Sequence, residues 1–104
     1  MTMLLDTNRF TKSQRAAIAG MPLAKRRLLA IVLRMQDRGI VPTAARLNPR
    51  SKRQHDTLGR WIREFRDSGL IGCYAPIRDQ PDPAPTEVEK IEKAKDAVRA
   101  EIGR

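Results

Sequence analysis

Apolar side chains recur at helical spacing through residues 22–38. In an α-helix, which turns about 100° per residue, these side chains would share one broad face. This face consists of Leu28, Leu29, Ile31, Val32, Leu33 and Met35. A stripe this wide predicts a helix that neighbouring elements cover on both sides. Gly39 follows the last periodic position and is expected to end the helix.

A second periodic segment spans residues 52–68. Its apolar positions follow the i, i+3, i+4, i+7 spacing of one amphipathic helix face and are Leu58, Trp61, Ile62 and Phe65. Ser51 and Gln54 have the spacing of a capping box at the start of this helix, and Gly69 follows its end. We therefore expect a helix with Trp61 in the core and its charged residues turned outward.

Shorter elements are predicted around these two helices. Thr11 and Gln14 form a capping-box pattern that would begin a helix ending at Ala19. A short helix is expected over residues 42–47, since the residue before Pro49 avoids the helical region. Apolar, β-prone stretches at residues 40–41 and 70–77 predict a minimal strand and a small β wing.

Positive charge is concentrated in the first three-quarters of the chain. Residues 1–78 hold 16 Lys and Arg against 5 Asp and Glu, whereas residues 79–104 hold 5 against 7. The two parts meet at a proline-rich stretch, residues 79–85, which favours an extended spacer. We therefore expect a basic domain at residues 1–78, a linker at 79–85 and a C-terminal segment at 86–104.

The C-terminal segment is predicted to form one helix over residues 87–102. Its apolar stripe is thin and consists of Val88, Ile91, Ala94 or Lys95, Val98 and Ile102. Such a helix is marginal alone and needs a partner surface. It either docks on the basic domain or pairs with the same helix of a second chain. Of the two arrangements we expect the second, which would make the protein a homodimer.

Composition narrows the possible functions. The net charge of +9 indicates a polyanionic partner, most simply nucleic acid.

Other classes of protein are not expected. No apolar run approaches the roughly 20 residues of a membrane span, and the opening residues lack the apolar core of a signal peptide. The single cysteine, Cys73, fits a reducing, cytoplasmic setting. One histidine and one cysteine are too few for a tetrahedral zinc site, and His55 lies in a basic run, so we expect no metal, no cofactor and no enzymatic activity.

Two segments carry a resemblance to a known family. They are VPTAARL at residues 41–47 and LGRWIREFRDSGLI at residues 58–71. In order and spacing, residues 22–78 resemble the winged helix-turn-helix domains of small phage and plasmid regulators. The resemblance implies a mainly α fold with a minimal β wing and a C-terminal helix. The first segment would be the positioning helix, and the second would belong to a recognition helix that enters the major groove of DNA.

The candidate DNA-binding residues lie before and along this recognition helix. They are Thr43, Arg46, Arg50, Ser51, Lys52, Arg53, Gln54, His55, Thr57, Arg60 and Arg63. Arg, Gln and His side chains can read base edges, whereas Lys and Ser more often contact the phosphate backbone. The expected function is therefore sequence-specific double-stranded DNA binding by a transcriptional regulator of a phage or mobile element.

Two alternatives use the same elements differently. An excisionase-like, partition or replication accessory protein would coat or bend DNA, because residues 43–45 and 60–63 also resemble the small winged helices of excisionases. In the second alternative, the protein is a small inhibitor or adaptor that binds a host protein. Steep loss of DNA affinity with salt separates the DNA-binding functions from the host-protein function.

Overall fold

The computed structural model describes residues 9–72 and 85–102 of the 104-residue chain. These residues are mainly helical, which confirms the expected class. The elements are α1 (Lys12–Ala19), α2 (Leu23–Asp37), the 3-10 helix η2 (Ala45–Leu47), α3 (Lys52–Asp67) and α4 (Pro85–Ile102). The helix predicted over 22–38 and the helix predicted over 52–68 are thus both present, each within one residue of its expected limits.

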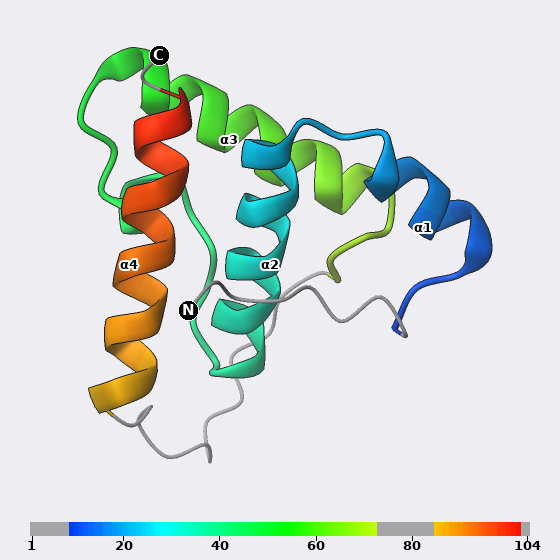
Figure 1. Ribbon diagram of the computed structural model, residues 1–104, viewed down its shortest axis with the longest axis horizontal. Coiled ribbons are helices and arrows are strands. Elements are labelled where there is room, and N and C mark those ends of the chain that lie inside the picture. The colour runs from blue at the N-terminus through cyan, green and yellow to red at the C-terminus, as the bar shows by residue number, and fades with distance from the viewer. Residues whose placement is uncertain (1–8, 73–84, 103–104) are drawn as a thin grey trace.

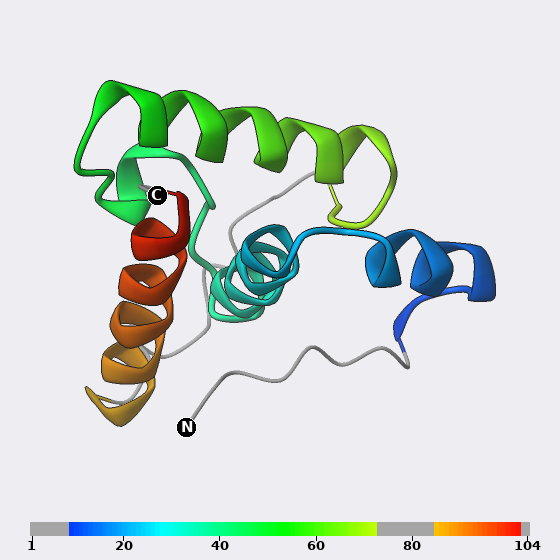
Figure 2. The same ribbon diagram turned by 45° about the horizontal axis from the view of Figure 1, so that its top comes forward.

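Helix α2 lies at the centre of the arrangement (Figure 1). Helix α4 packs beside it and runs in the opposite direction. Helix α3 crosses one end of this pair, and Figure 2 shows it lying along one side of the molecule. The first turns of α3 adjoin the last turns of α4, its last turns adjoin the start of α2, and Gly69, just after its end, contacts Gln14 in the first turn of α1.

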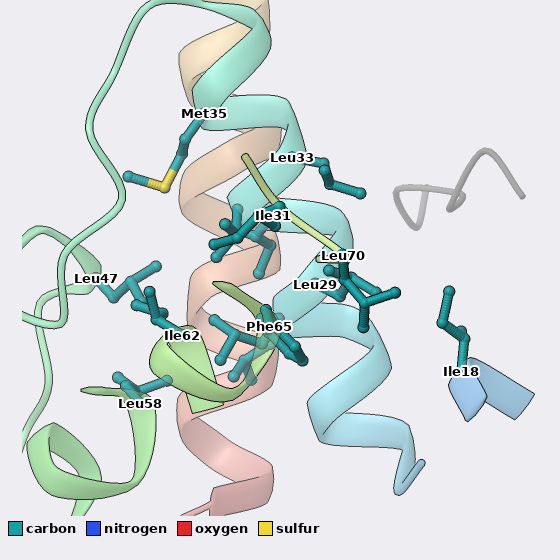
Figure 3. Close-up of a cluster of buried hydrophobic side chains, with 14 of the residues drawn as sticks. Ile18, Leu29, Ile31, Leu33, Met35, Leu47, Leu58, Ile62, Phe65 and Leu70 are labelled. Carbon is teal, nitrogen blue, oxygen red and sulfur yellow. The ribbon is translucent and has the colours of Figure 1, made fainter. Parts of the chain in front are cut away.

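The core is built around α2. Leu28, Leu29, Ile31 and Val32 are 0% exposed, which confirms that this helix is covered on more than one side. Figure 3 shows the buried side chains of α2 and α3 meeting one another, with Phe65 of α3 facing α2. Trp61 is only half-buried and packs on the edge of this cluster. The expectation of a core tryptophan is therefore met in part.

Helices α2 and α3 end in the same way. Gly39 and Gly69 have positive φ angles, 76° and 75°, in the left-handed region that suits glycine. After Gly39 the Ile40 N–H donates to the Met35 carbonyl (2.9 Å), and after Gly69 the Leu70 N–H donates to the Phe65 carbonyl (2.9 Å). Both ends are Schellman motifs, and both turn an apolar residue back onto the core.

These helix ends explain why the expected strands are missing. No strand occurs in residues 9–72 or 85–102, so a β wing is not shown. The Ile71 N–H also donates to the Phe65 carbonyl (3.3 Å), so the amides after α3 close the helix instead of pairing with a strand. The Ile40 amide is used likewise at the end of α2. The rest of the expected wing, residues 73–78, lies outside the described residues.

The predicted helix over residues 42–47 is shorter than expected. Only η2 forms, with the Arg46 N–H donating to Thr43 Oγ1 (3.2 Å). Asn48 adopts a left-handed conformation, with φ 52°, immediately before Pro49. The helix cannot continue through this pair, because proline disfavours helical geometry in the residue before it.

The C-terminal helix docks on its own chain. Ile91 and Val98 are buried in the common core, and Ala94 and Ile102 pack against it. Only Val88, near the start of the stripe, is exposed. The stripe that we considered for pairing two chains is therefore covered by α2 and α3. The homodimer stays a prediction, and it requires a surface other than this stripe or a displaced α4.

Helix α1 begins with the predicted capping box. The Gln14 N–H donates to Thr11 Oγ1 (3.2 Å), and the Thr11 N–H donates to Gln14 Oε1 (2.9 Å). Gln14 Nε2 also donates to the Gly69 carbonyl (3.4 Å), which ties α1 to the end of α3. Ile18 is the buried apolar anchor of α1.

Candidate nucleic-acid interface

Helix α3 has two contrasting faces. Leu58, Ile62 and Phe65 are buried against the core. The opposite face is exposed and carries five cations: Lys52, Arg53, Arg60, Arg63 and Arg66. The strong separation follows from the sequence, because every apolar position of this helix falls on one side. The outer face lies on one side of the molecule, where a long partner can reach it (Figure 2).

The cations on this face form no ion pair with the described residues. Within residues 9–72 and 85–102, no carboxylate forms an ion pair with Lys52, Arg53, Arg60, Arg63 or Arg66. Elsewhere, carboxylates do pair: Asp37 with Arg9, and Glu101 with Arg27. The positive charges on the outer face of α3 are thus open to an outside partner, whereas Arg9 and Arg27 are paired with carboxylates of this chain.

Three acidic side chains lie among or beside these cations. Asp56 and Asp67 are exposed on α3, and His55 Nδ1 lies 3.8 Å from Asp56 Oδ1. Glu64 instead accepts a hydrogen bond from Lys25 of α2. That hydrogen bond holds the pKa of the Glu64 carboxyl below its ordinary value, burial acts against it, and the charges of Lys25 and Arg60 add to the lowering.

The segment before α3 places two further arginines at the surface. Arg46 is exposed, and its guanidinium donates to the Val41 carbonyl (3.2 Å). The Arg50 side chain is 71% exposed, and its Nη2 lies 3.9 Å from Oδ1 of Asp96 in α4. At these exposures the Arg50–Asp96 pair is weak. Both arginines therefore lie near the first turn of α3, with their charged groups in contact with solvent.

The hydroxyl groups predicted to contact DNA are engaged or less exposed. Thr43 is exposed, but its Oγ1 accepts the Arg46 N–H. Ser51 is the N-cap of α3, and its Oγ accepts the Gln54 N–H (3.2 Å). Thr57 is half-buried. Thr43 and Ser51 therefore hold the backbone that carries the arginines.

Gln54 was expected to read bases, but its side chain lies inside the protein. The residue is 6% exposed. Its Oε1 accepts the Arg50 N–H (2.7 Å), and its Nε2 donates to the Arg99 carbonyl of α4 (2.9 Å). Both ends of the amide are used inside the protein, so none remains for a base. The capping-box spacing from Ser51 was the sequence signal that Gln54 faces the backbone.

Two buried cations of α4 adjoin this region and were missed. Lys95 and Arg99 are 7% and 8% exposed. Lys95 Nζ donates to the Arg46 carbonyl (3.0 Å), and Arg99 Nη1 donates to the Asn48 carbonyl (2.5 Å). Lys95 lies on the apolar stripe, four residues after Ile91, and this placement was a signal that its stem would be buried.

The structure therefore brings together most of the predicted site. Along the outer face of α3 and the turn before it lie Arg46, Arg50, Lys52, Arg53, His55, Arg60 and Arg63, all exposed. In the part of the chain that the structure describes, no helix is long and apolar enough to cross a membrane. The same residues contain no group of three His, Cys, Asp or Glu that could hold a metal ion.

Comparison with known proteins provides no relative from which a function could be transferred. No family model, no curated protein and no solved structure matches this chain. The resemblance to winged helix-turn-helix domains thus stays a prediction from the sequence pattern.

Proposed function

We propose that this protein binds double-stranded DNA by presenting the outer face of α3 to the major groove. The observation that carries the proposal is the row of exposed cations on one side of this helix, which form no ion pair with the described residues. Neutralising phosphates with such cations releases counterions from DNA, and this supplies much of the affinity. A major groove of about 12 Å width admits a helix of this kind.

The positions along α3 suggest a division of roles. Arg60 and Arg63 lie in the middle of the helix, where they can reach guanine edges. Lys52 and Arg53 lie in its first turn, where the helix dipole also favours a phosphate. Arg46 and Arg50 flank that turn and would follow the backbone of one strand. Asp56 and Asp67 give the face a mixed charge, which suits base discrimination, because a carboxylate accepts from cytosine N4.

Within this class, we propose a regulator of transcription in a phage or other mobile element. Support comes from the resemblance of residues 22–78 to winged helix-turn-helix domains. Such a regulator would recognise a site upstream of its own gene. Recognition of a row of tandem sites would instead favour an excisionase-like or partition protein, and loss of the DNA interaction altogether would favour a protein inhibitor or adaptor.

The test is a binding titration against labelled DNA from upstream of the gene, repeated over a series of salt concentrations. The native chain should bind with an affinity that falls steeply with salt. The double variant Arg60→Ala with Arg63→Ala should bind weakly and should discriminate less between the upstream DNA and mixed-sequence DNA, because both arginines are assigned to base edges. The matched control is Lys90→Ala with Lys93→Ala, which removes the same charge from exposed positions of α4.

Two outcomes would count against the proposal. Absence of binding by the native chain at ~100 mM salt would remove DNA as the partner. An equal loss in the α3 variant and the α4 control would mean that net charge alone attracts DNA, and that α3 is not the interface.

A further inference from the structure

Helix α4 contacts the proposed DNA-binding surface from behind. We propose that its buried cations Lys95 and Arg99 are positioning residues that hold the backbone of residues 46–50 and thereby set where Arg46 and Arg50 meet DNA. The inference deepens the proposed function and rests on it. Neither cation needs to touch DNA, because each is buried.

The segment between η2 and α3 needs partners for its carbonyl groups. A 3-10 helix of three residues leaves its last carbonyls without helical partners, and Asn48 turns the chain with a positive φ. Lys95 donates to the Arg46 carbonyl, and Arg99 donates to the Asn48 carbonyl. Both donors are charged, and hydrogen bonds from charged donors are stronger than neutral ones.

The other end of the segment is held through Gln54. Its amide group connects the Arg50 N–H to the Arg99 carbonyl. Residues 46 to 54 are therefore fixed to α4 at three points: the carbonyls of Arg46 and Asn48, and the side chain of Gln54. The backbone on either side of Arg50 is held, while the Arg50 side chain stays exposed.

Burying two cations is a costly way to dock a helix. Removing a charge from water has a penalty, and apolar side chains of similar size often stabilise a protein as well or better. Here the penalty is offset at the solvent edge, where Lys95 Nζ lies 2.7 Å from Glu92 Oε1 and Arg99 pairs with Asp96. Unlike an apolar contact, each cation requires one particular carbonyl as its partner. The two hydrogen bonds therefore fix the path of the backbone at residues 46–50 in addition to docking the helix.

The same contacts explain how α4 would influence DNA binding from a distance. If the carbonyls of Arg46 and Asn48 lost their donors, residues 46–50 would sample several positions. Arg46 and Arg50 would then have to be ordered again upon binding, and that ordering costs affinity. The cations on the outer face of α3 would keep their places, since Leu58, Ile62 and Phe65 anchor them independently.

The test uses the full chain with Lys95→Met, which keeps the apolar stem and removes the donor. The matched control is Lys93→Met, which removes the same charge from an exposed position two residues away. Affinity is measured with a labelled mixed-sequence duplex of about 30 base pairs, close to three helical turns. Amide hydrogen exchange is followed in parallel for residues 46–54 and for α2.

We expect Lys95→Met to weaken binding about tenfold more than Lys93→Met, with faster exchange confined to residues 46–54. Lys95→Arg, which retains a charged donor, should restore most of the affinity. If Lys95→Met does not fold, the same two measurements are made on Arg99→Gln, with Lys90→Gln as its control, and the same differences are expected.

Equal affinities of the Lys95 and Lys93 variants would overturn the inference. So would an equal rise of exchange in α2, because it would mean general destabilisation. A native chain that does not bind the duplex would instead refute the proposed function, and the exchange of residues 46–54 would still reveal whether Lys95 holds this segment.

Discussion

Helices α3 and α4 are both rich in cations, but α4, unlike α3, turns two of its four cations, Lys95 and Arg99, into the protein, while Lys90 and Lys93 stay exposed. All five cations of α3 are exposed and form no ion pair with the described residues. In α4, Lys95 and Arg99 are buried and donate to backbone carbonyls, while Glu101 and Asp96 pair with arginines of other segments. Among the described residues, unpaired charge thus separates the outer face of α3 from the buried side of α4, and the number of charges alone would not separate them.

The strongest test of this contrast acts on the buried side of α4. Val98→Asp places a carboxylate in the contact with α2, where Val98 is 1% exposed. We expect a loss of about 3–5 kcal/mol in the free energy of unfolding. Urea denaturation measures it. Ala100→Asp, at an exposed position of the same helix, should change stability by less than about 0.5 kcal/mol. Similar values for both variants would mean that α4 is not docked.

A second test separates the inner and outer faces of α3. Trp61 lies at their border and is half-buried. Trp61→Ala should destabilise the protein by about 2–3 kcal/mol, below the ~3–5 kcal/mol of a fully buried aromatic. Thermal unfolding provides the measurement. A variant of native stability that has lost DNA affinity would make Trp61 a DNA contact and would place the border elsewhere.

A third test removes one outer cation. Arg60→Ala should cost about 1–3 kcal/mol of binding free energy and leave the melting temperature unchanged, because the side chain is exposed. Lys90→Ala on α4 is the control, with a smaller loss. Competition titrations against specific and mixed-sequence DNA also report whether Arg60 contributes to recognition. Normal binding by Arg60→Ala would remove the middle of α3 from the interface.

The smallest effect concerns the ion pair between α2 and α3. Because the pKa of Glu64 is lowered in the folded protein, its pairing with Lys25 adds stability above the ordinary carboxyl pKa of 4.5. That contribution should disappear as the pH falls through the lowered value. The carboxylate is 47% exposed, so the effect is small. Glu64→Gln should reduce the difference in melting temperature between pH 7 and pH 3, and an unchanged difference would contradict the pairing.

Local patterns explain why much of the fold was predictable. The wide stripe of α2, the period of α3 and the glycines after both helices are short-range features that fix a helix and its end. The capping box of α1 was equally direct. The strand prediction failed at Leu70 and Ile71 because the same β-prone residues also satisfy a Schellman motif. Propensity could not reveal that their amides donate back to Phe65.

The candidate site was predictable only where exposure follows from helix period. Arg53, Arg60 and Arg63 were placed outward because the apolar positions of α3 are regular. For Gln54 and Lys95 the capping-box spacing and the apolar stripe indicate burial, but the carbonyls to which they donate lie more than 40 residues away in the chain and could not be identified. Such contacts depend on how α4 packs, and a single sequence does not encode that arrangement in any local pattern.

The packing of α2 against α4 also has a consequence for synthesis. A ribosome produces α2 early and α4 late, at roughly 5–20 residues per second. The apolar face of α2 that packs against α4 therefore has no cover from α4 in the nascent chain until residues 85–102 have emerged. Chains that lack residues 85–102 would keep this face exposed, and exposed apolar surface makes a chain prone to aggregation.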